Sequence, residues 1–136
     1  MNPRFERMAK AGPRLIAAPK SAYPSQVVEA PDSALRDVLA YMEANFDKSV
    51  RLAELAEMSA LSVSRFATVF RQRIGLSPYK YLCRVRVRRA QLLLLAGVPG
   101  AVVAAEVGFF DQSHLARHFK RFCGVTPTEF LQQARA

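Results

Sequence analysis

One stretch of the chain occurs twice in related form. The segment SRFATVFRQRIGLSPYKYL (64–82) aligns without a gap with SHLARHFKRFCGVTPTEFL (113–131). The copies share Ser, Ala, Phe, Gly, Pro and Leu at matching positions and elsewhere exchange similar residues, such as Arg71 for Lys120. Differences such as Thr68 against Arg117 fall on other helix faces. The pattern therefore indicates two equal scaffolds that present different chemistry to two targets.

The first copy, with the residues before it, has the pattern of a helix, a tight turn and a second helix. Leu52, Leu55 and Ala56 form the apolar face of a short helix, and SALS (59–62) supplies a polar turn with a cap. The second helix runs through Phe66, Val69, Phe70 and Ile74, and Gly75 should end it. Ser77 and Pro78 then form an N-cap with proline at the first helical position.

The second copy repeats this layout. Residues 102–104 form a short apolar helix, GFFD (108–111) is the turn, and Leu115, Phe119 and Phe122 mark a second helix that ends at Gly124. TPTE (126–129) is a capping box with proline inside it and starts a final helix.

The chain is therefore predicted to be all-α, with about seven helices in two helix-turn-helix subdomains joined by a long central helix. We expect the first helix-turn-helix at about 52–74, the connecting helix at about 78–96 and the second helix-turn-helix at about 100–123. An earlier helix should begin at Asp32 or Ser33 and continue through Phe46, since apolar residues follow there at helical spacing. The ordered domain would then span 32–136.

Residues 1–31 differ in composition from the rest. They hold five of the eight prolines, a basic excess and only scattered apolar residues, so we expect a poorly ordered arm or linker. This region lacks the continuous apolar stretch of a signal peptide, and no apolar run in the chain approaches the ~18 residues of a membrane span. We expect a cytoplasmic protein.

The charge is strongly positive. The formal net charge is +9, from 20 Lys and Arg against 11 Asp and Glu, and the sequence pI is about 10.3. This balance favours a polyanionic partner, either nucleic acid or an anionic membrane. The two cysteines, Cys83 and Cys123, make neither a disulfide framework nor a typical zinc spacing, so we interpret them as reduced and mostly buried thiols.

The outward faces of the two second helices are polar, rich in donors and without a carboxylate. With the apolar residues placed inward at 100° per residue, the outward arcs hold Ser64, Arg65, Thr68 and Gln72 in the first copy, and Ser113, His114, Arg117 and Arg121 with neighbouring Lys120 in the second. A helix in the DNA major groove needs such donors and no acids. On a single helix, contact with solvent alone would explain a polar, basic face. Two such faces, each after a tight turn, favour DNA binding.

Roles can be assigned within these arcs. Arg117 can bond guanine bidentately, Arg65 and His114 can reach a base edge or a phosphate, and Ser64, Thr68 and Ser113 suit short-range base contacts. Phosphate contacts are expected from Arg71, Gln72, Lys120 and Arg121. On the connecting helix, one of Arg84, Arg86, Arg88 and Arg89 is expected to pair with Glu54, Glu57 or Glu106.

An enzyme hypothesis would start from His114 and His118, which have the four-residue spacing of metal ligands on a helix. The intervening LAR offers no general base, and no third ligand is evident. We therefore expect no catalytic residue, no metal site and no cofactor.

The sequence resembles the DNA-binding domain of the AraC/XylS family of bacterial transcription regulators. The match runs from about Asp32 to Phe130 and includes Gly-Phe before the second recognition helix, Phe-Lys near its end, Gly-x-Thr-Pro after it and the Arg-Val-x-x-Ala stretch at 86–90. The resemblance implies recognition helices that enter successive major grooves, about 34 Å apart. It places base contacts at Ser64, Ala67, Thr68, Gln112, Ser113, His114 and Arg117.

Two positions depart from the family pattern. Ala60 stands where the first turn usually has glycine, and Gly100 where a large aliphatic residue is preferred, so the second scaffold helix is expected to pack loosely or start late. Family members also often carry a sensing and dimerising domain, which 31 basic, proline-rich residues cannot form. We expect that domain to be absent from this chain, and the DNA-binding domain to be monomeric.

The predicted function is sequence-specific binding of double-stranded promoter DNA in transcription control. The resemblance implies activation through nearby RNA polymerase, with repression by occlusion as the alternative. An alternative of a different class is a non-catalytic helical adaptor that binds an acidic partner or a membrane surface.

Overall fold

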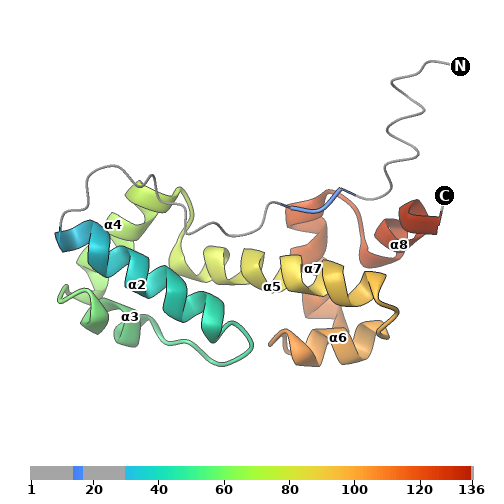
Figure 1. Ribbon diagram of the computed structural model, residues 1–136, viewed down its shortest axis with the longest axis horizontal. Coiled ribbons are helices and arrows are strands. Elements are labelled where there is room, and N and C mark those ends of the chain that lie inside the picture. Colours follow the sequence, from blue (N-terminus) through green and yellow to red (C-terminus); the bar gives the residue numbers. More distant parts are fainter. Residues whose placement is uncertain (1–13, 17–29, 136) are drawn as a thin grey trace, which may run out of the picture. The chain divides into compact units, whose positions relative to one another are not determined.

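The computed structural model describes residues 14–16 and 30–135 of the 136-residue chain. The described residues form helices and no strands, which confirms the all-α prediction (Figure 1). In chain order the helices are α2 (Ala30–Ala44), α3 (Leu52–Met58), α4 (Val63–Ile74), α5 (Pro78–Leu95), α6 (Gly100–Glu106), α7 (Gln112–Cys123) and α8 (Pro127–Arg135). Of the predicted arm, residues 1–13 and 17–29 lie outside the described part.

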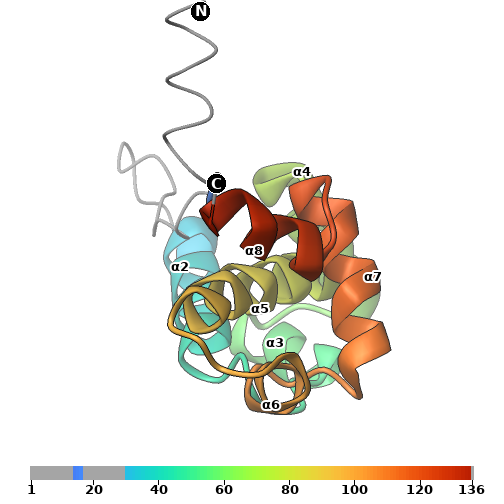
Figure 2. The ribbon, with the colours of Figure 1, turned by 90° about the vertical axis from the view of Figure 1, so that its right-hand side faces the viewer.

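The chain divides into two compact units. One holds α2, α3, α4 and the start of α5 as far as Val85, and the other begins at Arg86 within α5 and holds α6, α7 and α8 together with residues 14–16. Figure 2 looks onto the second unit, with α6, α7 and α8 around the end of α5. Each unit contains one helix-turn-helix, and the long helix α5 contributes residues to both.

The first unit is built around two aromatic rings of α4. Phe66 and Phe70 are both buried, with ring centroids 5.6 Å apart, and the Tyr81 ring lies 5.8 Å from Phe70 in an edge-to-face arrangement. The Tyr81 hydroxyl donates to Glu43 of α2 at 2.8 Å. The other core residues of this unit are Leu35, Val38, Leu39, Met42, Leu55, Ala56, Leu82 and Val85.

Helix α2 differs at both ends from the prediction. It begins at Ala30 rather than at Asp32 or Ser33, because proline is tolerated in the first turn, where its missing N–H has no intrahelical partner. It ends at Ala44, before Phe46, which lies in the following turn. Both the backbone N–H and the side-chain amide of Asn45 donate to the Tyr41 carbonyl, at 3.0 and 2.8 Å, and so close the helix.

The turn of the first helix-turn-helix contains a strained residue. Ala60 has φ 56°, in the left-handed region, and the Leu61 N–H reaches back to the Ala56 carbonyl at 3.1 Å. Ser62 then caps α4, with its hydroxyl accepting from the Arg65 N–H at 3.1 Å. Family members with glycine at the position of Ala60 would avoid the cost of a Cβ in this conformation.

The second turn repeats the first with one additional residue. Gly108 has φ 94°, and the Phe109 N–H donates to the Ala104 carbonyl at 2.9 Å, matching Ala60 and Leu61. The cap of α7 is Asp111, so Phe110 is the inserted residue, and its side chain is 90% exposed. The core of this unit includes Ala90, Leu94, Val103, Ala104, Val107, Phe109, Leu115, Phe119 and Phe130.

Three predicted helix ends are confirmed. Gly75 and Gly124 end α4 and α7 in left-handed conformations, with φ 90° and 79°. Thr126 and Glu129 form the expected capping box of α8, each side chain accepting from the other residue's backbone N–H, at 3.1 and 2.8 Å. These local signals identify helix ends without reference to tertiary contacts.

The expected late start of the second scaffold helix is wrong. Helix α6 begins at Gly100 and is seven residues long, the same length as α3. A Cβ on Gly100 would lie 2.5 Å from the Nε2 atom at the end of the exposed Gln112 side chain. The Gln112 amide thus occupies the space above the start of α6.

Candidate nucleic-acid interface

Helix α4 buries Phe66 and Phe70 and exposes the opposite face. The exposed residues are those predicted to contact DNA from this copy, Ser64, Arg65, Thr68, Arg71 and Gln72. The Thr68 hydroxyl donates to the Ser64 carbonyl at 3.1 Å, which holds its oxygen near the start of the helix. Five polar side chains of the first copy are therefore accessible to a ligand.

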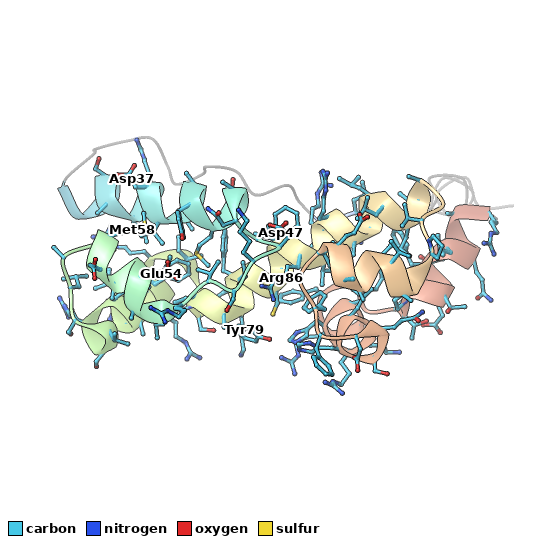
Figure 3. The ribbon with its side chains drawn as sticks, turned by 90° about the horizontal axis from the view of Figure 1, so that it is seen from below. Asp37, Asp47, Glu54, Met58, Tyr79 and Arg86 are labelled. Atoms are coloured by element: carbon cyan, nitrogen blue, oxygen red, sulfur yellow. The ribbon has the colours of Figure 1, made fainter. Side chains whose placement is uncertain are left out.

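Ala67 is the exception among the residues predicted on α4. It is half-buried and lines an apolar pocket of about 330 Å³. Leu52, Pro78 and Tyr79 also line this pocket, and Figure 3 labels Tyr79, which belongs to the first turn of α5. A base contact by Ala67 stays a prediction, but its side chain faces protein as well as solvent.

Helix α7 has the same division into two faces. Leu115 and Phe119 are buried, while five of the six predicted residues are exposed, namely Gln112, Ser113, Arg117, Lys120 and Arg121. Like α4, this helix contains no acidic residue, although its cap is Asp111. The exposed face is thus cationic and rich in donors, as a phosphate-lined groove requires.

His114, the sixth predicted residue on α7, is held by the turn that precedes the helix. Its ring lies against Phe109, with centroids 5.1 Å apart, and its Nδ1 accepts from the Phe110 N–H at 3.2 Å. The His114 Nε2 atom faces the His118 Nε2 atom at 3.2 Å. His114 is therefore half-buried and braces the second turn, and base contact by its ring stays a prediction.

His118 stacks on the other side of the same aromatic residue. Its ring is 8° from parallel to Phe109 at 5.2 Å. The pKa of His118 is lowered below 6.5, first by burial and then by His114 and the nearby arginines Arg121, Arg117 and Arg86.

Burial also raises the pKa of the Cys123 thiol to about 11. Across the described ranges, no group of three or more His, Cys, Asp or Glu side chains is arranged to hold a metal ion.

The arginines of α5 occupy different environments. Arg86 is buried, and its guanidinium carbon lies 5.6 Å from the Phe109 ring centroid (Figure 3 labels Arg86). Arg89 is exposed, whereas Nε and Nη1 of Arg88 are buried without a hydrogen-bond partner in the described structure. Glu54, one of the expected ion-pair partners, instead accepts from the Arg51 N–H and the Tyr41 hydroxyl.

Phe110 was not predicted as a site residue. It lies at the tip of the second turn, directly before the cap of α7, and is almost fully exposed. The one-residue difference in turn length between the two copies is the pattern that would have identified it.

None of the helices in the described ranges is long and apolar enough to cross a membrane.

The sequence from 55 to 133 matches the family model described as a helix-turn-helix domain. The chain belongs to the AraC family of helix-turn-helix domains. Among its relatives, the arabinose operon regulatory protein of Salmonella typhimurium is 37% identical over 73% of this chain. The chain spans 36% of that protein's length.

Solved structures of AraC-type domains have the same fold. A probable AraC family transcriptional regulator from Rhodopseudomonas palustris is 31% identical, with a TM-score of 0.67 over 76% of this chain and 99% of that one. The DNA-binding domain of AdpA, described as a global transcriptional factor and solved with a target DNA, is 28% identical, with a TM-score of 0.69 over 75% and 93%.

Proposed function

We propose that this chain is the DNA-binding part of a transcription regulator and reads a specific duplex sequence with α4 and α7. The observation that carries the proposal is the pair of exposed, acid-free faces on two helices that each follow a capped turn. Each helix is anchored by two buried aromatic or aliphatic residues on its inner face. The likeness to a domain solved with its target DNA supports the same role.

In this proposal the side chains fall into two groups, those that contact bases and those that contact phosphates. Arg117 bonds a guanine edge through two parallel N–H groups, and Thr68 and Ser113 make short contacts to neighbouring bases. Arg71, Gln72, Lys120 and Arg121 hold phosphates and fix the register without reading sequence. The protein acts as a binding module, without catalysis.

The regulatory output is proposed from the relatives. The regulator RhaS of Escherichia fergusonii, named as a transcriptional activator, is 31% identical over 74% of this chain. We therefore infer activation through contact with RNA polymerase at a promoter on the bacterial chromosome, by a DNA-binding domain that acts as a monomer. A reporter assay with and without the protein separates activation from repression, because occlusion would lower output.

Two substitutions on one helix test the assigned roles. Arg117→Ala should weaken binding to the preferred duplex by about 1–3 kcal/mol and relax the preference at one base pair, because it removes a bidentate base contact. Lys120→Ala should weaken binding to all sequences alike and flatten the salt dependence, because it removes a phosphate contact. Both are measured by titration of specific and scrambled duplexes at several salt concentrations.

The two variants are matched, since both remove an exposed cation from α7 without touching its buried face. Equal losses on specific and scrambled duplexes for both variants would contradict the division into base and phosphate contacts.

A further inference from the structure

A glutamine in the second unit is completely buried and uses its side chain to bind a distant part of the chain. Gln91 of α5 has 0% of its surface exposed. Its Oε1 accepts from the backbone N–H of Ile16 at 3.1 Å, and its Nε2 donates to the backbone carbonyl of Arg14 at 3.3 Å. A buried amide needs such partners, because an unpaired donor or acceptor loses its hydration without replacement.

The two hydrogen bonds join Gln91 to the residues on either side of Leu15, through the Arg14 carbonyl and the Ile16 N–H. A primary amide offers one acceptor and two donors in one plane, so it can pair with the N–H and C=O groups on one edge of a backbone segment. Recognition in this mode reads the main chain rather than a side chain. In agreement, the Leu15 side chain is 37% exposed, whereas Ile16 is half-buried.

A third contact connects this amide with the recognition helix. The Gln91 Nε2 atom also lies 3.2 Å from the Sγ atom of Cys123, the last residue of α7. The helix ends there, since Gly124 follows in a left-handed conformation. One side chain of α5 therefore contacts both the segment 14–16, blue in Figure 1, and the end of the helix proposed to read DNA.

We propose that the surface around Gln91 is a docking site for a peptide backbone, occupied by the chain's own residues 14–16, and that docking steadies the C-terminal turn of α7. The site couples the N-terminal arm to the second recognition helix. Undocking would break the two hydrogen bonds from Gln91 and expose the half-buried Ile16 side chain.

Amide hydrogen exchange of the full chain tests the docking. The Ile16 amide should exchange on the order of ten times more slowly than in an unstructured peptide of the same sequence, given one modest hydrogen bond. Gln91→Met, which keeps the size of the side chain, should return that rate to the peptide value. Gln132→Met on the exposed surface of α8 is the matched control and should leave it unchanged.

A pair of proline variants tests the coupling without altering the core. Ile16→Pro deletes the backbone N–H that donates to the Gln91 Oε1 atom. Leu15→Pro deletes a neighbouring N–H that does not bond Gln91. Ile16→Pro should speed amide exchange of Cys123 and its neighbours several-fold, and Leu15→Pro should not. An Ile16 amide unprotected in the wild type, or identical α7 exchange in the two proline variants, overturns the proposal.

Discussion

At the residue scale, the two turns differ in the residue that adopts the left-handed conformation. Ala60 adopts φ 56° where its counterpart Gly108 has φ 94°, so alanine bears in the first turn a conformation that glycine accepts without strain in the second. A left-handed conformation costs an L-residue about 1–2 kcal/mol. The first turn keeps its hydrogen bonds in spite of this cost, including the one from Leu61 to Ala56.

This comparison predicts opposite effects for two substitutions. Ala60→Gly should raise the free energy of unfolding by about 0.5 kcal/mol, since relief of the strain exceeds the added backbone entropy of glycine. Gly108→Ala should lower it by at least about 1 kcal/mol. Urea unfolding followed by circular dichroism measures both, and a destabilised Ala60→Gly variant would show that the turn favours a Cβ here.

Some residue roles could not be predicted from sequence. The helical spacing correctly separated exposed Thr68 and Arg117 from buried Phe70 and Phe119. It placed His114 on the outward arc as well, because a helical projection does not include the turn, and the bond from the Phe110 N–H draws that ring inward. The contact between Gln91 and residues 14–16 joins positions far apart in sequence, which no local pattern encodes.

At the scale of the element, α7 contributes His114 and His118 to a cluster of rings around Phe109. His118 stacks on Phe109, and burial, with His114 and nearby arginines, lowers its pKa. The folded chain therefore keeps His118 neutral at a pH where the unfolded chain takes up a proton. The stability that it contributes is present above about pH 6.5 and is lost as the pH falls from there toward the lower folded pKa.

The consequence is a specific pH dependence of unfolding. Between about pH 7 and 5 the wild-type free energy of unfolding should decrease, and His118→Gln should flatten part of that slope, because glutamine does not titrate. Lys120→Gln, on the exposed side of the same helix, should keep the wild-type slope. Denaturant titrations at several pH values provide the measurement, and parallel profiles for wild type and His118→Gln would refute the assignment.

Helix ends were the most predictable elements, because their chemistry is local. The caps at Ser62 and Thr126 and the stops at Gly75 and Gly124 were all identified from residue types a few positions apart. The start of α6 at Gly100 agrees with the predicted start of the second helix-turn-helix at about 100, so the departure of Gly100 from the family pattern did not delay the helix. The end of α2 was missed, since Phe46 continues the apolar spacing beyond the cap at Asn45.

At the scale of the whole molecule, the duplication appears as two units, and each unit contains one helix-turn-helix. Both helices follow a turn with a left-handed residue and a side-chain cap, and both end at a left-handed glycine. Their outward residues differ, since Thr68 in one copy corresponds to Arg117 in the other. In the proposed function, each unit contributes its own part of the sequence specificity through its exposed helix.

Selection of bound sequences from a random duplex pool, at near-physiological salt and with bulk competitor DNA, tests this account most directly. We predict a motif with two informative blocks about one helical turn, ~34 Å, apart. Thr68→Ala should weaken the preference in one block only, and Arg117→Ala in the other only. Sequence-indifferent binding by the wild type, or loss of the same block in both variants, would contradict the account.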